Sequence, residues 1–583
     1  MDDSDNVHAA RAMVDSVASA AAARERGSVA IQSSDQLQHA HVPPGLSVPL
    51  WRRRRVSGAR RPPALLVVPA LIVGMVMALP LVYIVIRAAE SDTSVLSLVF
   101  RDRTLGVLRN SVLLASAVAG AGTFIALPLA WLTTRTDLPF RRFWAILAGL
   151  PLVIPSYVGA LAIVSALGPR GLLQGWLEGP FGVERLPDIY GFTGAWLALT
   201  LFTYPYIYLS VRAALKGLDP SLEDASRCLG YGAWRTFFGC VLPQLRPAIA
   251  SGGLLAALYT ISDFGVVTML RYDVFTRAIY VQYRSSFDRS AAAVLAALLV
   301  LVAVGLVVAE GRIRGRNTYH ALGSSAKRAP RTIALGRWTW PALIFCGVMA
   351  LSALGLPIFV LVFWIVRGIS GGEGLERLPD LIGNSLAAGG FAAVATTLAA
   401  LPIAALAVRY RGWSAQLGAR IAYLGYALPG IVIALAFVYF GANHAPAIYQ
   451  TMLLLVIAYA VRFLPQAVGA QRLSMLQLNP RLEEASRTLG RSAFQTLARV
   501  TLPLTRPGVL TGAALVMLTV MKDLPITLIL SPIGFNTLAT EIWQYSTSGS
   551  YGRAAAPALA LVLLSAIPSL LLTTRVGDQP VSS

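Results

Sequence analysis

The sequence predicts an all-α polytopic membrane protein, with about twelve transmembrane helices arranged as two pseudo-symmetric six-helix halves. The first observation is composition: the 583 residues are 56% hydrophobic and 13% charged, with a mean hydropathy of +0.64. These values are typical of a chain embedded in a bilayer. The second observation is an internal repeat, which predicts two halves of one design.

Twelve apolar stretches are each long enough to cross a bilayer as a helix of roughly 20 residues. Because six spans per half is an even number, both halves enter the membrane in the same orientation. We therefore expect a pseudo-twofold axis along the membrane normal, with a pathway between the halves. The approximate spans are 64–88, 107–133, 143–167, 193–215, 247–270, 290–309, 340–366, 384–408, 417–440, 447–471, 507–530 and 554–574.

The repeat is clearest in a polar stretch between two spans. Residues 219–247 and 479–507 align without a gap at an offset of 260 and agree at 14 of 29 positions. Earlier features recur at an offset of 274, so the first half is expected to hold a longer loop near 168–192. The features at that offset are Asn110-Ser111 with Asn384-Ser385, Ala126-Leu127-Pro128 with Ala400-Leu401-Pro402, and Pro155 with Pro429.

Each polar stretch carries start and stop signals for a short helix. Asp219 and Asn479 are residues that cap helix N-termini, and a proline follows each at the first helical position. An acidic pair then lies near the positive end of the helix dipole. Gly230 and Gly490 are placed to adopt the left-handed conformation that ends a helix. Such a helix is either a solvated connector or a docking surface.

The formal net charge of +21 follows membrane topology and does not indicate a nucleic-acid partner. The connector 311–338 has seven basic residues and no acidic ones, and other basic residues, including Arg135 and Arg409, fall in alternate loops. Loops of the opposite set are neutral or acidic, as around Glu373 and Glu376. The positive-inside rule places both termini, the connector and both repeated loops in the cytoplasm.

The sequence predicts no catalytic residues, metal site or cofactor in this chain. Its three cysteines form no disulfide framework and its five histidines show no metal-ligand spacing. No phosphate-binding Gly-x-x-x-x-Gly-Lys-Ser/Thr loop occurs, so any ATPase would be another polypeptide. The expected domains are a disordered cytoplasmic extension (1–60), a first half (61–310) with its loop at 216–247, a basic cytoplasmic linker (311–338), a second half (339–576) with its loop at 476–507, and a tail (577–583).

The repeated loop resembles the EAA loop of binding-protein-dependent ABC importer permeases. The resemblance rests on Glu/Asp-Ala-Ser-x-x-x-Gly, followed by Leu-Pro twelve and thirteen residues after the glycine, in both halves. In that family the loop helix docks on an ATPase subunit and transmits its closure to the membrane helices. Asp224 departs from the pattern, as do Ser226 and Ser486, which replace the second alanine. The resemblance implies a type I importer fold and these coupling residues: Glu223, Asp224, Ala225, Ser226, Gly230, Pro243, Glu483, Glu484, Ala485, Ser486, Gly490 and Pro503.

A second motif is similar to a segment typical of fused ferric-iron permeases. It comprises residues 521–528 (Met-Lys-Asp-Leu-Pro-Ile-Thr-Leu) and 534–540, although that family more often has Glu in place of Asp523. The first-half counterpart of Asp523 is Asp263, at the offset of 260. Ionisable residues within a span are costly and usually face a protein interior or a water-filled cavity.

Two interpretations of this motif remain open. In one, Asp263, Lys522 and Asp523 line or gate the external mouth of the pathway, and Pro525 breaks its helix there. In the other, Lys522 and Asp523 pair locally and cap a broken helix at the membrane interface.

Together the resemblances predict the membrane subunit of an ATP-driven importer of the bacterial inner membrane, closest to those for ferric iron. They imply two copies of a cytoplasmic ATPase, which would bind ATP, a periplasmic substrate-binding protein, and membrane lipid as partners. Thiamine, 2-aminoethylphosphonate and polyamines stay open as substrates, because the binding protein selects the substrate. An alternative of another class is a secondary transporter driven by an ion gradient through Asp263 and Asp523, which would leave the paired loops without a role.

Overall fold

The computed structural model describes residues 63–90, 97–219, 221–285, 290–314, 332–372, 375–410, 425 and 428–577. The predicted N-terminal extension lies outside the described residues. So do the middle of the predicted linker, the start of the predicted span 417–440 and nearly all of the C-terminal tail.

Every regular element in the described part is helical, apart from one isolated β-bridge between Thr136 and Ile333. Helices satisfy the backbone hydrogen bonds within one segment, as a bilayer requires. The first half holds α2 (Ala64–Glu90), η1 (Ser97–Phe100), α4 (Asp102–Arg135), α5 (Arg141–Leu147), η2 (Leu150–Val153), α6 (Ser156–Leu167), α7 (Leu172–Phe181), α8 (Phe192–Gly217), α9 (Ser221–Cys228), α10 (Ala233–Thr236), η3 (Phe237–Val241), α11 (Leu242–Ser262), α12 (Gly265–Met269), α13 (Phe275–Ser285) and α14 (Ser290–Arg314).

The second half repeats this order. It holds η4 (Gly336–Trp338), α15 (Thr339–Ala350), η5 (Leu351–Gly355), α16 (Leu356–Ser370), α17 (Leu378–Arg409), α19 (Gly430–His444), η6 (Pro446–Ile448), α20 (Met452–Gln477), α21 (Pro480–Thr488), α22 (Ala493–Thr496), η7 (Leu497–Thr501), α23 (Leu502–Met521), α24 (Pro525–Leu530), α25 (Leu538–Thr547) and α26 (Tyr551–Gly577).

Each of the twelve predicted spans has a helix. Within the described residues, nine helices are long and apolar enough to cross a membrane. Two shorter apolar helices, Gly430–His444 and Tyr551–Ala566, and the 26-residue α8 occupy the other three predicted spans. The spans predicted at 143–167, 247–270 and 507–530 are not single helices, because the first divides at Pro155 and the others are interrupted after Ser262 and Met521.

Three long helices form the core of each half: α4, α8 and α11 in the first, and α17, α20 and α23 in the second. Small residues at matched positions of the two halves allow these helices to approach one another closely. A Cβ added to Gly252 would come within 2.7 Å of the Ile207 backbone, and one on Gly512 would lie 3.1 Å from the Ala470 Cβ. Such small residues are typical of helix contacts in membranes.

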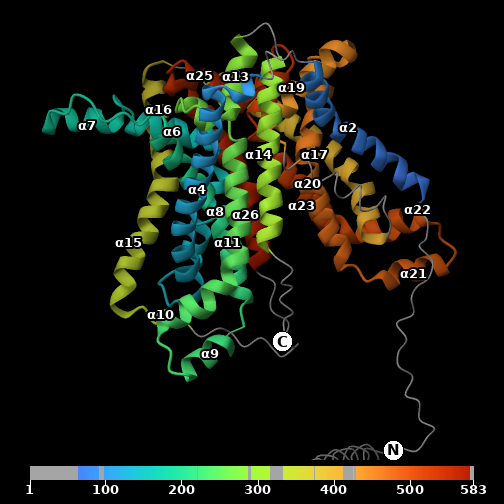
Figure 1. Cartoon of the computed structure of the whole chain (residues 1–583), viewed down its shortest axis with the longest axis horizontal. Helices are drawn as coiled ribbons and strands as arrows, with labels where there is room; N and C mark the ends of the chain where they lie inside the picture. Colours follow the sequence, from blue (N-terminus) through green and yellow to red (C-terminus); the bar gives the residue numbers. More distant parts are fainter. Residues whose placement is uncertain are drawn as a thin grey trace, which may run out of the picture. The chain divides into compact units, whose positions relative to one another are not determined.

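The outer helix of each half also packs against the other half. Helix α2 packs against α17 and α19 of the second half, where the Arg87 guanidinium lies 4.8 Å from the centre of the Tyr439 ring (Figure 1). Helix α16 packs against α6 of the first half, where the Trp364 indole N–H donates to the Ser165 hydroxyl over 2.5 Å. Each of these helices also packs on the last helix of its own half, α14 or α26, so the outer helices join the two halves.

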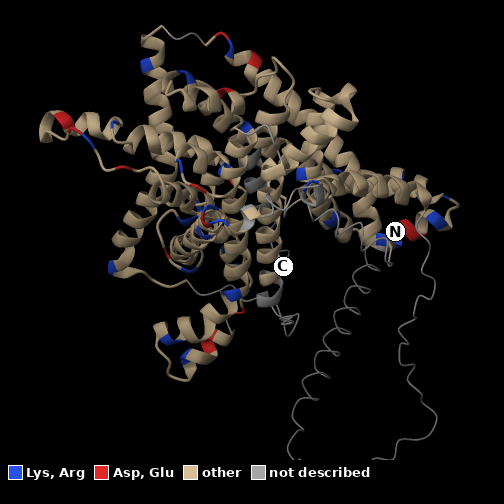
Figure 2. Ribbon diagram, turned by 45° about the horizontal axis from the view of Figure 1, so that its top comes forward, with Lys and Arg blue, Asp and Glu red and all other residues tan. Residues whose placement is uncertain are grey.

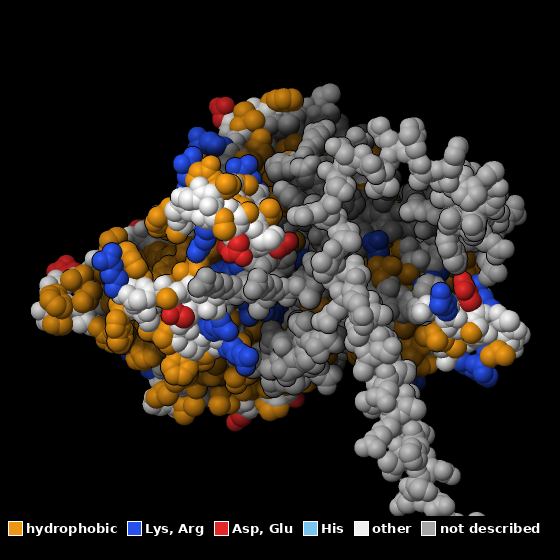
Figure 3. Space-filling model, turned by 90° about the horizontal axis from the view of Figure 1, so that it is seen from below, with side chains coloured by type: hydrophobic (Ala, Val, Ile, Leu, Met, Phe, Trp, Pro, Cys, Tyr) orange, Lys and Arg blue, Asp and Glu red, His pale blue; other side chains and the backbone are white. Residues whose placement is uncertain are grey.

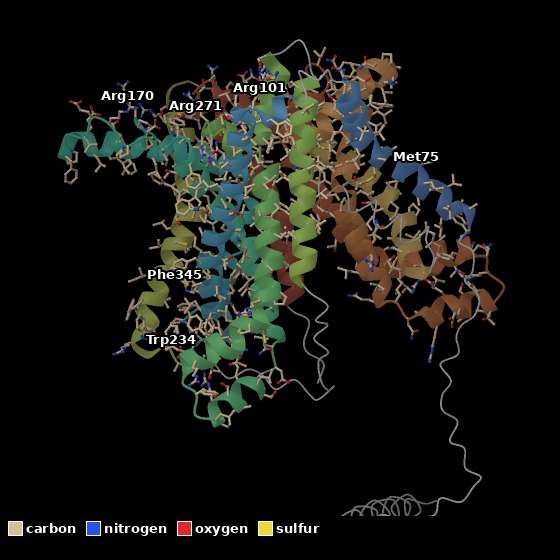
Figure 4. The ribbon with its side chains drawn as sticks, in the orientation of Figure 1. Met75, Arg101, Arg170, Trp234, Arg271 and Phe345 are labelled. Atoms are coloured by element: carbon tan, nitrogen blue, oxygen red, sulfur yellow. The ribbon has the colours of Figure 1, made fainter. Side chains whose placement is uncertain are left out.

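The two short loop helices, α9 and α21, lie at the same end of the helical bundle and apart from each other (Figure 1). Figure 2 shows acidic and basic residues on both loops, whereas the long helices are mostly uncharged. The opposite end carries charge as well, including Arg101, Arg170 and Arg271 (Figure 4).

Candidate functional site

Helices α9 and α21 begin as their capping signals predict. The Asp219 carboxylate accepts a hydrogen bond from the Ser221 backbone N–H over 2.9 Å, and this bond lowers the pKa of Asp219. In the second half the Asn479 side chain accepts from the Arg481 N–H over 3.1 Å. Each side chain satisfies a backbone donor that the first helical turn leaves free.

Both helices also end at the predicted glycines. Gly230 and Gly490 have φ of 82° and 83°, a left-handed conformation that other residues adopt at a cost. Beyond each glycine the next N–H turns back to bond the Ser226 or Ser486 carbonyl over 3.3 Å. This return bond is typical of a helix that ends at a left-handed glycine.

The two neighbouring acids of each loop face different surroundings. Glu223 turns inward, and its carboxylate lies 2.7 Å from the guanidinium of Arg135, which is 2% exposed. Glu483 likewise accepts from Arg409 Nε over 3.0 Å and from the Thr501 hydroxyl over 2.8 Å. The following acids of the motif, Asp224 and Glu484, are instead exposed, as are Ala225 and Ala485. Only the second acid of each pair is available to a partner.

The serines that depart from the family pattern have a structural partner. The Ser226 hydroxyl lies 3.1 Å from the Thr236 hydroxyl, and Ser486 lies 3.1 Å from Thr496. Each hydrogen bond holds the loop helix against the short helix, α10 or α22, that leads back to the membrane. Serine therefore joins the two parts of the loop, which an alanine there could not do.

Pro243 and Pro503 lie in the first turn of α11 and α23. A π-helical turn precedes each helix: η3 in the first half and η7 in the second. Proline has no N–H for the regular helical bond, and the wider turn keeps the segment helical at that point. The short helices α10 and α22, which follow the loop helices after the glycine turn, are therefore continuous with α11 and α23.

Each loop exposes hydrophobic side chains beside its exposed acid. Leu229 and Leu489 are 76% and 82% exposed, and Trp234 and Phe494 are exposed in α10 and α22. Seen from the loop end, hydrophobic, basic and acidic side chains are intermingled on both loops (Figure 3). Exposed apolar groups rimmed by charge mark surfaces that bind other proteins.

The second group of predicted residues lies at two matched helix breaks. Asp263 follows α11, and its carboxylate accepts from the Val266 N–H over 2.9 Å and from the Ser156 hydroxyl over 2.5 Å. Its own carbonyl accepts from the Thr276 hydroxyl over 2.6 Å. Asp263 thus caps α12 and ties the break to α6.

At the other break the local pairing of Lys522 with Asp523 is not observed. Asp523 accepts from the Ile526 N–H over 3.0 Å, so it caps α24, but its ion pair is with Arg462, 3.2 Å away. Lys522 instead donates to the Leu152 carbonyl of the first half over 3.1 Å. Pro525 occupies the first turn of α24. The capping half of that interpretation is correct, and the pairing half is wrong.

The two breaks differ in what faces the aspartate. Gly430 takes the position that Ser156 holds in the first half, and a Cβ there would overlap the Arg462 guanidinium. In the second half a long basic side chain therefore replaces the small hydroxyl beside the carboxylate.

Sequence reasoning gave no role to the repeated Asn-Ser pairs. Asn110 donates to the Asp273 carbonyl over 3.1 Å, and the Ser111 hydroxyl accepts from the Phe275 N–H over 3.2 Å. The second half has the corresponding bonds. Asn384 donates to the Asn536 carbonyl over 2.9 Å, and the Leu538 N–H donates to the Ser385 hydroxyl over 2.8 Å. The recurrence of Asn-Ser at an offset of 274 was the signal for this contact.

Within the described residues no group of three His, Cys, Asp or Glu side chains is placed to hold a metal ion. The arrangement instead joins two loop helices, each with an exposed acid and apolar surface, to membrane helices that are broken at matched aspartates. Such an arrangement is suited to passing movement between the exposed loops and the membrane helices.

The chain matches twice the family described as "Binding-protein-dependent transport system inner membrane component", over residues 119–309 and 395–574. These two segments cover more than half of the sequence, one in each half. The chain belongs to this family. It is a multi-pass permease of the inner membrane.

Relatives extend the match to nearly the whole chain. The Fe(3+)-transport system permease protein FbpB 2 of Haemophilus influenzae is 35% identical over 519 residues, which are 88% of this chain and 98% of the relative. The ferric transport system permease protein FbpB of Actinobacillus pleuropneumoniae is 27% identical over 494 residues, 82% of this chain and 72% of the relative. The molybdenum transport system permease protein ModB of Escherichia coli K12 is 34% identical over 165 residues, 27% of this chain and 68% of the relative.

Proposed function

We propose that this chain is the membrane subunit of an ATP-driven importer that moves ferric iron, delivered by a periplasmic binding protein, across the inner membrane. The observation that carries the proposal is the similarity, over almost its full length, to a permease named for Fe(3+) transport. The family description supports a binding protein as partner. The paired loops support a partner that pulls on both halves.

Two copies of a cytoplasmic ATPase would bind the two loops, one copy each. Each loop offers the same exposed features: an acid (Asp224 or Glu484), an alanine after it, and an exposed leucine (Leu229 or Leu489). Two equivalent docking surfaces suit two identical partners. ATP itself would bind to those partners, and this chain would need no cofactor of its own.

The topology that suits this function has both termini, the linker 311–338 and the loops 216–247 and 476–507 in the cytoplasm, as the positive-inside rule predicts. ATP binding would close the ATPase dimer and draw α9 and α21 together. A ligand that binds one conformation better than another shifts the population toward it, so closure would favour the outward-open state.

In this scheme Asp263, Lys522, Asp523 and Pro525 belong to the gate at the external end. Their supporting observation is the hydrogen bond from Lys522 to the Leu152 carbonyl, which joins the two halves beside a helix break. Phe264, at the other break, lies 5.1 Å from the Trp543 ring of the second half. Both contacts would separate when the pathway opens outward.

The test is to purify the intact complex from native membranes, identify its partners by mass spectrometry and assay the captured binding protein for metal. We expect an ATPase subunit and a binding protein that carries iron in stoichiometric amount. A binding protein that carries an organic ligand and no metal would reject iron as the substrate. A reproducible absence of any ATPase would overturn the importer itself.

A further inference from the structure

Helices α4 and α17 are attached at both ends to the parts that the proposed function requires to move. At the loop end the last residue of each helix, Arg135 or Arg409, holds the inward-facing acid of a loop helix at 2.7 or 2.9 Å. Arg135 is almost completely buried, so it has little freedom to follow the loop without moving its own helix.

At the opposite end the same helices hold the segment that follows each helix break. Ser111 accepts the N–H of Phe275, the first residue of α13, and Ser385 accepts the N–H of Leu538, the first residue of α25. Helix α13 packs against α19 of the other half, and α25 packs against α6. Trp543, which contacts Phe264 across the halves, lies on α25.

The spacing of the two attachments is identical in the two halves. Ser111 precedes Arg135 by 24 residues, and Ser385 precedes Arg409 by 24. At about 1.5 Å per residue, the attachments lie about 36 Å apart, slightly more than the hydrocarbon core of a bilayer, which is about 30 Å thick. In Figure 4, Arg101, which precedes α4, and Trp234 on α10 lie toward opposite ends of the helical bundle.

We propose that α4 and α17 are the relay elements of the transporter, and that Arg135, Arg409, Ser111 and Ser385 are their positioning residues. Movement of a loop helix passes through its Glu–Arg ion pair into the long helix, and then through the serine hydroxyl into α13 or α25. There it changes the contact between the halves at the external end. This inference rests on the proposed function.

The relay explains why two adjacent acids are present in each loop. One acid, Asp224 or Glu484, is exposed toward a partner, whereas the other, Glu223 or Glu483, is held by the relay helix. The first would receive the movement, and the second would transmit it. Apolar packing would be enough to stabilise α4 and α17. Their polar bonds to a loop helix at one end and to α13 or α25 at the other are what a relay requires.

The first experiment removes only the serine hydrogen bond of each outer attachment. Ser111→Ala and Ser385→Ala are combined in the full chain, and the permease is reconstituted with its ATPase and iron-loaded binding protein in vesicles. The matched control is Thr123→Ala, because the Thr123 hydroxyl bonds only the Ala119 carbonyl of its own helix. We expect the serine variant, which loses one such hydrogen bond in each half, to lose at least about three- to tenfold in iron transported per ATP hydrolysed, the range that a single lost hydrogen bond commonly produces. ATPase association should stay unchanged, and the control should match the wild type.

The second experiment asks whether the two ends act as one unit. Arg135→Gln with Arg409→Gln should also lower transport per ATP, and the charge-exchanged pairs Arg135→Glu with Glu223→Arg and Arg409→Glu with Glu483→Arg should restore part of it. In the variant that combines the arginine and serine changes, the loss of transport per ATP should be smaller than the product of the two separate fold-losses. A relay that is already broken at one end loses little more when the other end is broken as well. Normal coupling in the serine variant, or multiplicative losses in the combined variant, would overturn the relay. Failure of the wild-type complex to transport iron would instead reject the proposed function.

Discussion

At the scale of single residues, Glu483 and Glu484 are neighbours in the chain and yet have separable roles. Glu483 is bonded to Arg409 and Thr501, whereas Glu484 is exposed. We expect Glu483→Gln to lower the stability of the permease by about 1–3 kcal/mol, because it weakens a charge-assisted bond to a half-buried arginine. Glu484→Gln should change stability by no more than about 0.5 kcal/mol, yet weaken ATPase association several-fold. Thermal unfolding and co-purification of the ATPase check both outcomes, and equal effects of the two changes would contradict the division of roles.

Gly490 sets where the loop helix ends. Because its φ is 83°, an alanine there would be strained by about 1–2 kcal/mol, and relief would reorient the exposed Leu489 beside it. Gly490→Ala should therefore reduce the amount of ATPase that co-purifies with the permease. Gly469→Ala is the matched control, since Gly469 lies inside α20 with open space around its missing Cβ, and there alanine should be neutral or slightly stabilising. Unchanged association in Gly490→Ala would show that the turn is not needed for docking.

At the scale of elements, the two helix breaks share a cap but not a charge balance. Asp263 is bonded to a hydroxyl and to a backbone N–H, whereas Asp523 also balances the charge of Arg462. Asparagine can still accept the capping bond at either position. We therefore expect Asp263→Asn to cost about 1 kcal/mol and Asp523→Asn about 2–4 kcal/mol, since the latter leaves a partly buried guanidinium uncompensated. Thermal unfolding of the purified permease measures the difference, and equal losses would argue against the ion pair.

Elements with local signals were predictable, and contacts between distant segments were not. The ends of α9 and α21 follow from Asp219, Asn479 and two glycines, because caps and left-handed turns depend on residues within one helical turn. The pair between Arg135 and Glu223 joins residues 88 apart, and the sequence pattern around this arginine indicates only membrane topology. Lys522 donates to the Leu152 carbonyl of the other half, and the spacing of these two residues in the sequence does not predict that they lie close together.

At the scale of the whole described bundle, packing of the outer helices across both halves limits how the halves can move. Because α2 packs on the second half and α16 on the first, separating the halves completely would expose both packed faces. A pivot that opens one end while closing the other keeps these contacts. The loop helices lie apart at one end, and Lys522 bridges the halves at a helix break, an arrangement that suits a pathway closed at the end away from the loops (Figure 1).

A pivot of this kind makes the distance between the loops depend on ATP. The test uses a permease in which Cys228, Cys240 and Cys346 are replaced by serine. Two cysteines are then introduced at exposed positions by Leu229→Cys and Leu489→Cys. Without nucleotide, a long bis-maleimide should cross-link these two cysteines in low yield. A non-hydrolysable ATP analogue should raise the yield several-fold, because closure of the ATPase pair draws α9 toward α21. The same variant without the ATPase subunit is the control, and its yield should not respond to nucleotide. A yield that stays constant in the complete complex would mean that the loops move together with a rigid pair of halves, and the pivot would be wrong.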